Sequence, residues 1–208
     1  MKGKNLFLIA AFIAFAKISF AQRIIGDCTI IYDVVIDKGS DSTLVPNNLT
    51  KTVYIKGKQV RIDLTSPSFN QTTIFSSSNG TAVILKEVGT NKYISTFDEA
   101  IWKQKNKQYE NIETTFPAGE ETILGYRCKK AVSKLKDGKT IEMYYTTDIA
   151  PSTQENPYQF KNIPGLVLQY QSQLEGSNRV IIFKAVKIDL SPVPMSKFDI
   201  PKSGYRVL

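Results

Sequence analysis

The stretch N-I-P-G-L-V-L-Q-Y-Q-S-Q-L, residues 162–174, begins with a turn signal and continues with period-two alternation. Pro164-Gly165 favours a turn, because proline presets φ and glycine adopts positive φ without steric cost. The pattern predicts a strand with one dry face and one wet face. The predicted dry face carries Leu166, Leu168, Tyr170 and Leu174, and the wet face carries Val167, Gln169, Gln171 and Gln173.

Other segments carry the same kind of signal. A second apolar run, 179–190, returns directly after a turn at 175–178, and Asn79-Gly80 and Asp137-Gly138 are strong hairpin-turn signals. One helix is predicted over 98–105, with Asp98 as its cap and Ile101 and Trp102 as its docking residues. We therefore predict a mainly β chain, an antiparallel curved sheet of about ten or eleven strands with one short helix.

The first 21 residues are predicted to be a signal peptide rather than part of the fold. Lys2 and Lys4 precede the apolar run 6–16, and Ser19-Phe20-Ala21 offers small residues at the two positions that a signal peptidase inspects. The alternative is a membrane anchor, but the apolar run spans only about half of the ~30 Å hydrocarbon core. We expect an exported protein of the periplasm or cell envelope, or a secreted one, with no transmembrane segment after cleavage.

The remainder, 22–208, suits a single antiparallel β domain with a proline-containing C-terminal tail over 191–208. The formal net charge of +8 is scattered along the chain. No basic stripe with interleaved aromatic residues is present in the sequence, so nucleic acid is not expected as a partner.

The two cysteines, Cys28 and Cys128, both fall on apolar faces of predicted strands. Cysteines in an exported chain usually pair, so a disulfide between them is predicted. Two buried free thiols are the alternative. The absence of a C-x-x-C motif argues against a catalytic role for either sulfur.

Residues for catalysis are scarce. The sequence contains no histidine, which removes the commonest general base and metal ligand together with every Ser-His or Cys-His arrangement. Metal binding by thiolates would need more than two cysteines, and no phosphate-binding glycine loop occurs. We predict no catalytic residues, no metal and no cofactor, hence no enzyme.

Aromatic residues gather around the opening stretch. They either pack a β core or form the rim of an apolar ligand site, which would need an open concave face. The residues of this predicted rim are Tyr144, Tyr145, Tyr158, Phe160 and Tyr170.

The motif Ile163-Pro164-Gly165-Leu166-Val167-Leu168 resembles the G-L-P-G-L-I signature of the GLPGLI family, exported proteins of Gram-negative bacteria. Its companions are Y-I-K-G-K-Q-V-R-I-D at 54–63, L-G-Y-R-C-K-K-A at 124–131, M-Y-Y-T-T-D-I at 143–149 and F-D-I-P-K-S-G-Y at 198–205. The family has no established activity. Its strand pattern is similar to that of lipoprotein-carrier (LolA-like) proteins, and this similarity implies a half-barrel around an apolar cavity.

Three functions remain open at this point. The first is a non-enzymatic envelope protein that binds a lipid or other apolar ligand in the half-barrel, with 148–164 as rim or lid. The second is a module with a filled core that binds an envelope protein partner. The third is an enzyme of unrecognised type. The ligand, the partner and the oligomeric state are not fixed by the sequence.

Overall fold

The computed structural model describes residues 23–36, 49–173 and 180–208. The predicted signal peptide, the turn at 175–178 and Leu174 lie outside the described residues. The strands are β1 (Arg23–Ile25), β2 (Asp27–Ile36), β3 (Thr50–Lys56), β4 (Gln59–Ser66), β5 (Phe69–Ser76), β6 (Ala82–Val88), β7 (Asn91–Phe97), β8 (Glu113–Thr115), β9 (Glu120–Ile123), β10 (Tyr126–Lys134), β11 (Thr140–Thr146), β12 (Ile149–Pro151), β13 (Leu166–Gln173), β14 (Val180–Asp189) and β15 (Arg206–Val207). The helices are α2 (Glu99–Lys105) and the 3₁₀ turns η2 (Lys107–Tyr109) and η3 (Met195–Phe198).

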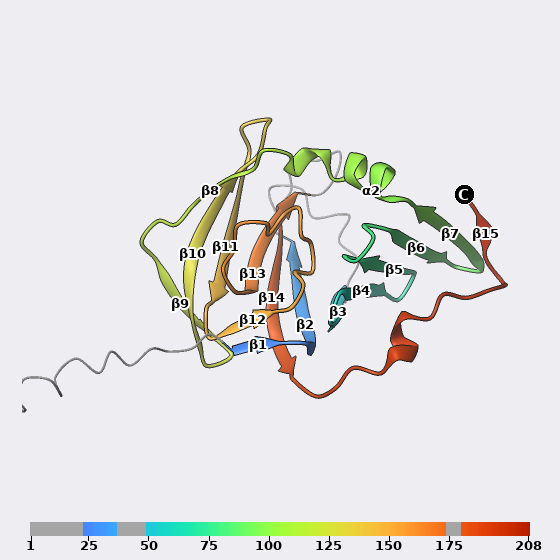
Figure 1. Cartoon of the computed structure of the whole chain (residues 1–208), viewed down its shortest axis with the longest axis horizontal. Coiled ribbons are helices and arrows are strands. Elements are labelled where there is room, and N and C mark those ends of the chain that lie inside the picture. The colour runs from blue at the N-terminus through green and yellow to red at the C-terminus, as the bar shows by residue number, and fades with distance from the viewer. Residues whose placement is uncertain (1–22, 37–48, 174–179) are drawn as a thin grey trace, which may run out of the picture.

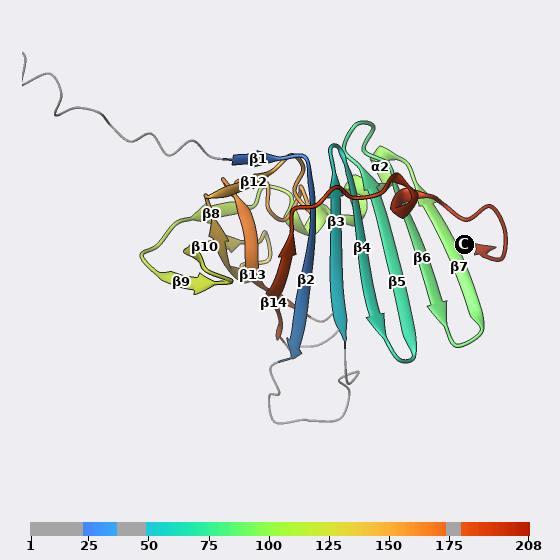
Figure 2. The same cartoon turned by 90° about the horizontal axis from the view of Figure 1, so that it is seen from below.

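Thirteen of these strands form one sheet, in the order β15-β7-β6-β5-β4-β3-β2-β14-β13-β11-β10-β8, with β9 paired to β10. Neighbours pair antiparallel, except for β15, which runs parallel to β7. The sheet curves strongly but has two free ends, so it is an open sheet and not a barrel (Figures 1 and 2). The prediction of a mainly β, curved antiparallel sheet with one short α-helix is confirmed.

The predicted number of strands was too low. The first apolar segment of the domain does not form one strand: Gly26 divides it into β1 and β2, and β1 pairs with β12 in a separate parallel pair. Leu124 and Gly125, which have φ of 52° and 82°, likewise divide an apolar-patterned segment into the hairpin β9–β10. Strands of two to four residues are too short to show periodicity, so the sequence pattern does not detect them.

The core lies on the concave side of the sheet. Cross-strand partners face the same side of a sheet. The pairs Tyr32↔Lys51 and Lys51↔Leu64 therefore place side chains of β2, β3 and β4 together on the concave side. The fully buried members of this core include Cys28, Ile30, Tyr32, Val53, Ile55, Val60, Cys128, Met143, Phe160 and Leu168.

The predicted wet residue Val167 is buried in this core. A register shift in the β11–β13 pairing sets Tyr145 opposite Val167 but Tyr144 opposite Gln169, so Leu168 is an extra residue on β13. A β-bulge of this kind turns the following side chains to the other face. Val167 therefore shares the face of Tyr145, and the strict alternation predicted for 166–173 fails at this point.

Helix α2 and the segment 152–165 cover the concave side near β5 (Figure 1). Asp98 caps α2 as predicted, since its carboxylate accepts a 2.8 Å hydrogen bond from the backbone nitrogen of Ile101. Trp102 docks the helix by stacking on Phe75, with ring centroids 6.3 Å apart, and by a tilted contact with Phe97 at 5.8 Å. Ile101 does not dock, because 49% of its surface is exposed.

Residues 191–208 cross the convex side of the sheet (Figure 2). Val193 and Phe198 bury Ile74 in a small second cluster. Arg61 holds the segment by donating a 2.7 Å hydrogen bond to the carbonyl of Lys197. Among the described residues, no helix has the length and apolar character needed to span a membrane.

Candidate ligand-binding site

The motif 163–168 spans the end of the covering segment, 152–165, and the start of β13. Gly165 lies so close to β11 that a Cβ atom there would sit 1.9 Å from the carbonyl oxygen of Thr146. Gln154 donates hydrogen bonds to the carbonyls of Ile163 (3.2 Å) and Gly165 (3.0 Å). Ile163, Leu166, Val167 and Leu168 are buried, and Pro164 is exposed. The motif is therefore a structural joint between the covering segment and β13.

An ion pair lies buried beneath the covering segment. Lys51, from β3, is 6% exposed, and Glu155, from the covering segment, is 8% exposed. The Lys51 ammonium donates to Glu155 Oε1 and to the hydroxyl of Tyr170, and that hydroxyl donates to Glu155 Oε1 at 3.0 Å. Residues more than 100 positions apart in the chain thus meet at one point.

Aromatic rings surround the ammonium. Lys51 Nζ lies 4.8 Å from the ring centroid of Tyr170, 4.9 Å from that of Phe183 and 5.4 Å from that of Tyr32. Tyr170 stacks on Phe183, with centroids 4.8 Å apart, and meets Phe160 edge-on at 5.1 Å. A desolvated cation over aromatic faces is stabilised by the ring quadrupoles, so the cluster holds the charge without solvent.

Burial raises the pKa of Tyr32 and of Tyr170 well above the ordinary value, and the negative charge of Glu155 raises each further. Both phenols therefore stay protonated and act as donors. Tyr32 donates a 2.8 Å hydrogen bond to the carbonyl of Val167. This bond ties β2 to β13 across the concave side.

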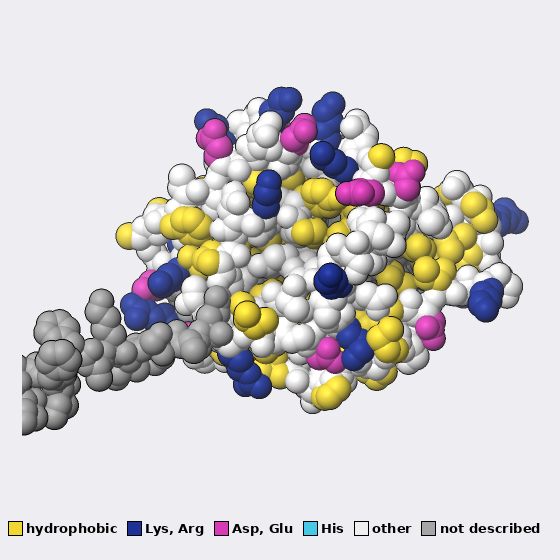
Figure 3. Space-filling view, viewed as in Figure 1, with side chains coloured by type: hydrophobic (Ala, Val, Ile, Leu, Met, Phe, Trp, Pro, Cys, Tyr) yellow, Lys and Arg dark blue, Asp and Glu magenta, His cyan; other side chains and the backbone are white. Residues whose placement is uncertain are grey.

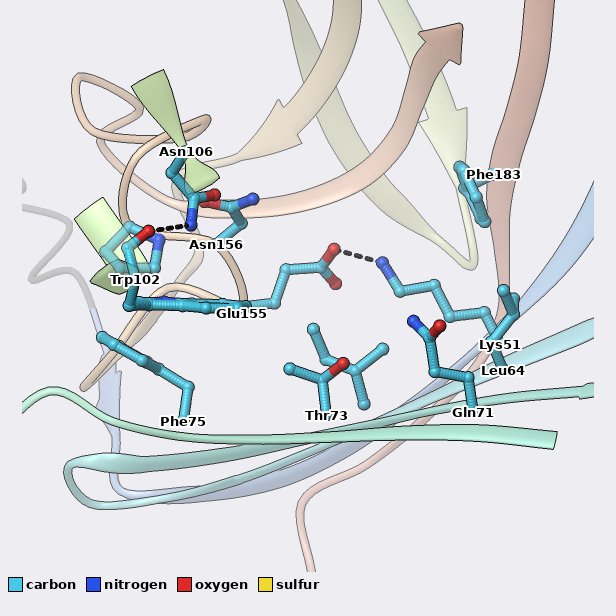
Figure 4. Close-up of a pocket in the computed structure, with 12 residues that line it drawn as sticks. Lys51, Leu64, Gln71, Thr73, Phe75, Trp102, Asn106, Glu155, Asn156 and Phe183 are labelled. Atoms are coloured by element: carbon cyan, nitrogen blue, oxygen red, sulfur yellow. Dashed lines mark hydrogen bonds and ion pairs between the residues drawn. The ribbon is translucent and has the colours of Figure 1, made fainter. Parts of the chain in front are cut away.

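A cavity of about 240 Å³ opens between the ion pair and the concave face of the sheet. Figure 4 shows the Glu155 side chain extending across it toward Lys51, above Thr73. Glu155 Oε2 is buried and has no hydrogen-bond partner among the described residues. The cavity is lined by Lys51, Ile62, Leu64, Gln71, Thr73, Phe75, Trp102, Asn106, Glu155, Asn156, Pro157 and Phe183.

A wider groove of about 630 Å³ adjoins the cavity and shares Asn106 and Pro157 with it. It runs between α2–η2 and the end of the covering segment. In the space-filling view, hydrophobic side chains gather below α2 and toward β6 and β7, with charged side chains around the periphery (Figure 3). The other residues that line the groove are Ala100, Lys103, Gln104, Lys107, Tyr109, Glu110, Asn111, Ile112, Tyr158, Lys161 and Asn162.

The five aromatic residues of the predicted rim do not form one rim. Phe160 and Tyr170 meet in the buried cluster, whereas the ring of Tyr145 is buried against Phe116 at a centroid distance of 5.9 Å. Tyr158 lines the groove, and Tyr144 is half-buried on β11. A role in ligand binding for these residues stays a prediction.

The predicted disulfide is not formed, because Cys28 and Cys128 are both free and buried. Cys28 lies on β2 and Cys128 on β10, and the sheet order places β14, β13 and β11 between them. The two cysteines therefore lie on strands that are not neighbours in the sheet. A shared apolar face did not imply pairing.

We expect both thiols to be inert to a thiol reagent in the native protein. Burial raises the pKa of Cys28 to about 12 and that of Cys128 to about 11, so neither forms the reactive thiolate near neutral pH. The measurement is thiol titration of non-reduced protein, first native and then in denaturant. Two reactive thiols should appear only on unfolding. None in denaturant would mean that the cysteines are bridged after all.

Lys51 and Glu155 were missed by the sequence reasoning. Lys51 alternates with the buried residues Val53 and Ile55, which places it on the dry face of β3. This position in the alternation was the one signal in the sequence that Lys51 is buried. A lysine near the end of a strand is ordinarily expected to extend its ammonium into solvent, and nothing local to Glu155 indicates burial.

Comparison with known proteins gives the family. Over residues 32–197 the chain matches the model of the N-glycanase peptide, N-terminal domain. No curated protein sequence matches it. This match does not test the resemblance to the GLPGLI family or to the LolA-like carriers, so both resemblances stay predictions.

Two solved structures share the fold. A structure of PNGF-II is 16% identical with a TM-score of 0.51, covering 87% of this chain and 30% of that one. An uncharacterized conserved protein from Thermus thermophilus is 10% identical with a TM-score of 0.51, covering 88% of this chain and 90% of that one. The chain thus spans about a third of the length of PNGF-II. With four-fifths of its length matched by the family model, the chain belongs to the family of N-glycanase peptide N-terminal domains.

Proposed function

We propose that this chain is an exported, non-enzymatic binding domain that holds a small ligand in the cavity between Glu155 and the concave face. One observation carries the proposal: Glu155 lines a cavity, and the buried oxygen Oε2 of its carboxylate has no partner among the described residues. Leaving a buried acceptor unsatisfied costs about 1–3 kcal/mol, and more when the group is charged. A bound donor would recover that cost.

The buried ion pair supports the same proposal. Replacing a buried ion pair by apolar residues often leaves the stability of a protein unchanged or raises it. A gain in stability alone therefore does not explain why a buried ion pair is present. Lys51 and Glu155 would instead fix a defined polar site inside an apolar fold. The aromatic and amide side chains around it are of the kind that orient small ligands.

A ligand with a long acyl chain fits this cavity poorly. Its volume of about 240 Å³ is below the ~300–1,000 Å³ of usual drug-sized ligand pockets. An acyl chain would also lie against the Lys51–Glu155 pair and leave Glu155 Oε2 unsatisfied. A small polar ligand therefore takes precedence over the lipid that the half-barrel resemblance implied.

We propose no N-glycanase activity for the chain by itself. It belongs to a family named for an N-terminal domain and covers 30% of the PNGF-II chain. Its sequence contains no histidine, and the carboxylate of its central cluster is already engaged by Lys51 and Tyr170. The basic and apolar leader at 1–21 supports export to the periplasm or envelope, or secretion.

The test uses Trp102, the one tryptophan of the sequence, which lines the cavity. We expect a library of small polar compounds to contain members that shift its fluorescence saturably, whereas a fatty acid does not. Replacing Thr73 by leucine should abolish the response by filling the cavity. A folded protein that responds to no compound would refute the proposal, and saturable fatty-acid binding would restore the lipid hypothesis.

A second candidate function is an interaction module that binds an envelope protein. Phe116 favours it, because 51% of this large apolar side chain is exposed beside a surface pocket of about 340 Å³ bordered by Tyr145 and Lys129. Crosslinking in intact envelopes should then recover one protein partner, and a Phe116→Glu variant should lose it. Loss of the partner with an unchanged Trp102 response would separate the two functions.

A further inference from the structure

We infer that the cavity beneath Glu155 selects a neutral ring compound that donates a hydrogen bond through a hydroxyl group. This inference rests on the proposed binding function and names its ligand class. The determining contact is between the ligand hydroxyl and Glu155 Oε2, the acceptor that the protein leaves without a partner among its described residues.

The charge of the cavity lining excludes charged ligands. Lys51 and Glu155 are the two ionisable side chains among the residues that line it, and each is engaged by the other. Their charges are opposite and their side chains are 7% and 6% exposed, so the lining as a whole is neutral. A carboxylate or an ammonium group on the ligand would lose its hydration and find no uncompensated opposite charge in the lining.

The donor requirement follows from the carboxylate. An ionised carboxylate only accepts hydrogen bonds, and Oε1 is already occupied by Lys51 and Tyr170. Oε2 therefore needs a donor from the ligand. The nearby hydroxyl of Thr73 and amide of Gln71 can both donate and accept, which suits additional ligand hydroxyl groups (Figure 4).

The apolar part of the lining fixes the shape of the ligand. Phe75, Trp102 and Phe183 supply flat aromatic surfaces, against which the carbon framework of a ring can pack. The volume of about 240 Å³ equals the liquid volume of roughly eight water molecules. A single six-membered ring with its substituents has this size, and a longer ligand would continue past Asn106 and Pro157 into the groove.

Four matched probes test the inference: benzyl alcohol, benzyl methyl ether, benzoate and benzylammonium. They present the same ring with, respectively, a neutral donor, a neutral group without a donor, an anion and a cation. The readout is the indole N–H signal of Trp102 in a nitrogen–proton correlation spectrum, where a single tryptophan gives a single signal. We expect benzyl alcohol to shift it saturably, and the ether to bind about tenfold more weakly or worse.

The location is tested with two variants of the full chain. Thr73→Leu, on the cavity floor, should abolish the benzyl alcohol shift, whereas Thr52→Leu, on β3 and outside the cavity lining, should retain it. Equal binding of the alcohol and the ether would overturn the inference, as would preferential binding of either ion or no shift with any probe. If an ion binds best, the cavity remains a binding site and only the ligand class is wrong.

Discussion

Replacing Gly165 by alanine is expected to lower the free energy of unfolding by about 3 kcal/mol or more. The added Cβ would lie 1.9 Å from the carbonyl oxygen of Thr146 and 2.8 Å from its carbonyl carbon. Both are backbone atoms of a residue paired with Leu166 in the β11–β13 ladder. Relief would therefore require the covering segment to lift or the ladder to shift.

Urea unfolding followed by Trp102 fluorescence and circular dichroism measures this effect. Gly26→Ala is the matched control, since Gly26 has no atom within 4 Å of the position of an added Cβ and is not among the residues with positive φ. It should change the unfolding free energy by about 0.5 kcal/mol or less. Equal midpoints for the two variants would show that the close approach at Gly165 is not needed for folding.

Much of the sheet could be predicted from alternation and turn residues. Gly80 and Gly138 both have positive φ, and the strands beside them pair antiparallel, so both predicted hairpin turns are present. These turns and strands are predictable because turn residues and side-chain alternation depend on only a few neighbouring residues. The division at Leu124 could not be predicted in this way, since leucine seldom adopts positive φ.

The site could be predicted only in part. Tyr170 and Phe160 were identified from their aromatic character, and both belong to the cluster around Lys51. Glu155 was not, because its burial depends on the covering segment folding over β3, 104 residues earlier in the chain. Contacts at this separation leave no periodic trace in the covering segment.

Removing the charge of Lys51 is the second large effect that we expect. In a Lys51→Met variant, Glu155 would remain buried with only the Tyr170 hydroxyl as a donor. An uncompensated buried charge costs about 3–5 kcal/mol, so the urea midpoint should fall well below that of the wild type. Arg127→Met is the control, because Arg127 and Glu120 form a pair on the exposed surface and its loss should leave the midpoint unchanged.

Adding Glu155→Gln to Lys51→Met should recover most of the lost stability. The glutamine removes the unpaired charge and keeps a carbonyl oxygen that accepts from Tyr170, so the two substitutions are coupled rather than additive. A double-mutant cycle over the four proteins measures this coupling, which should be several times that of an exposed pair. If Lys51→Met unfolds at the same urea concentration as Arg127→Met, then water reaches the pair, and the dry polar site on which the binding proposal depends does not exist.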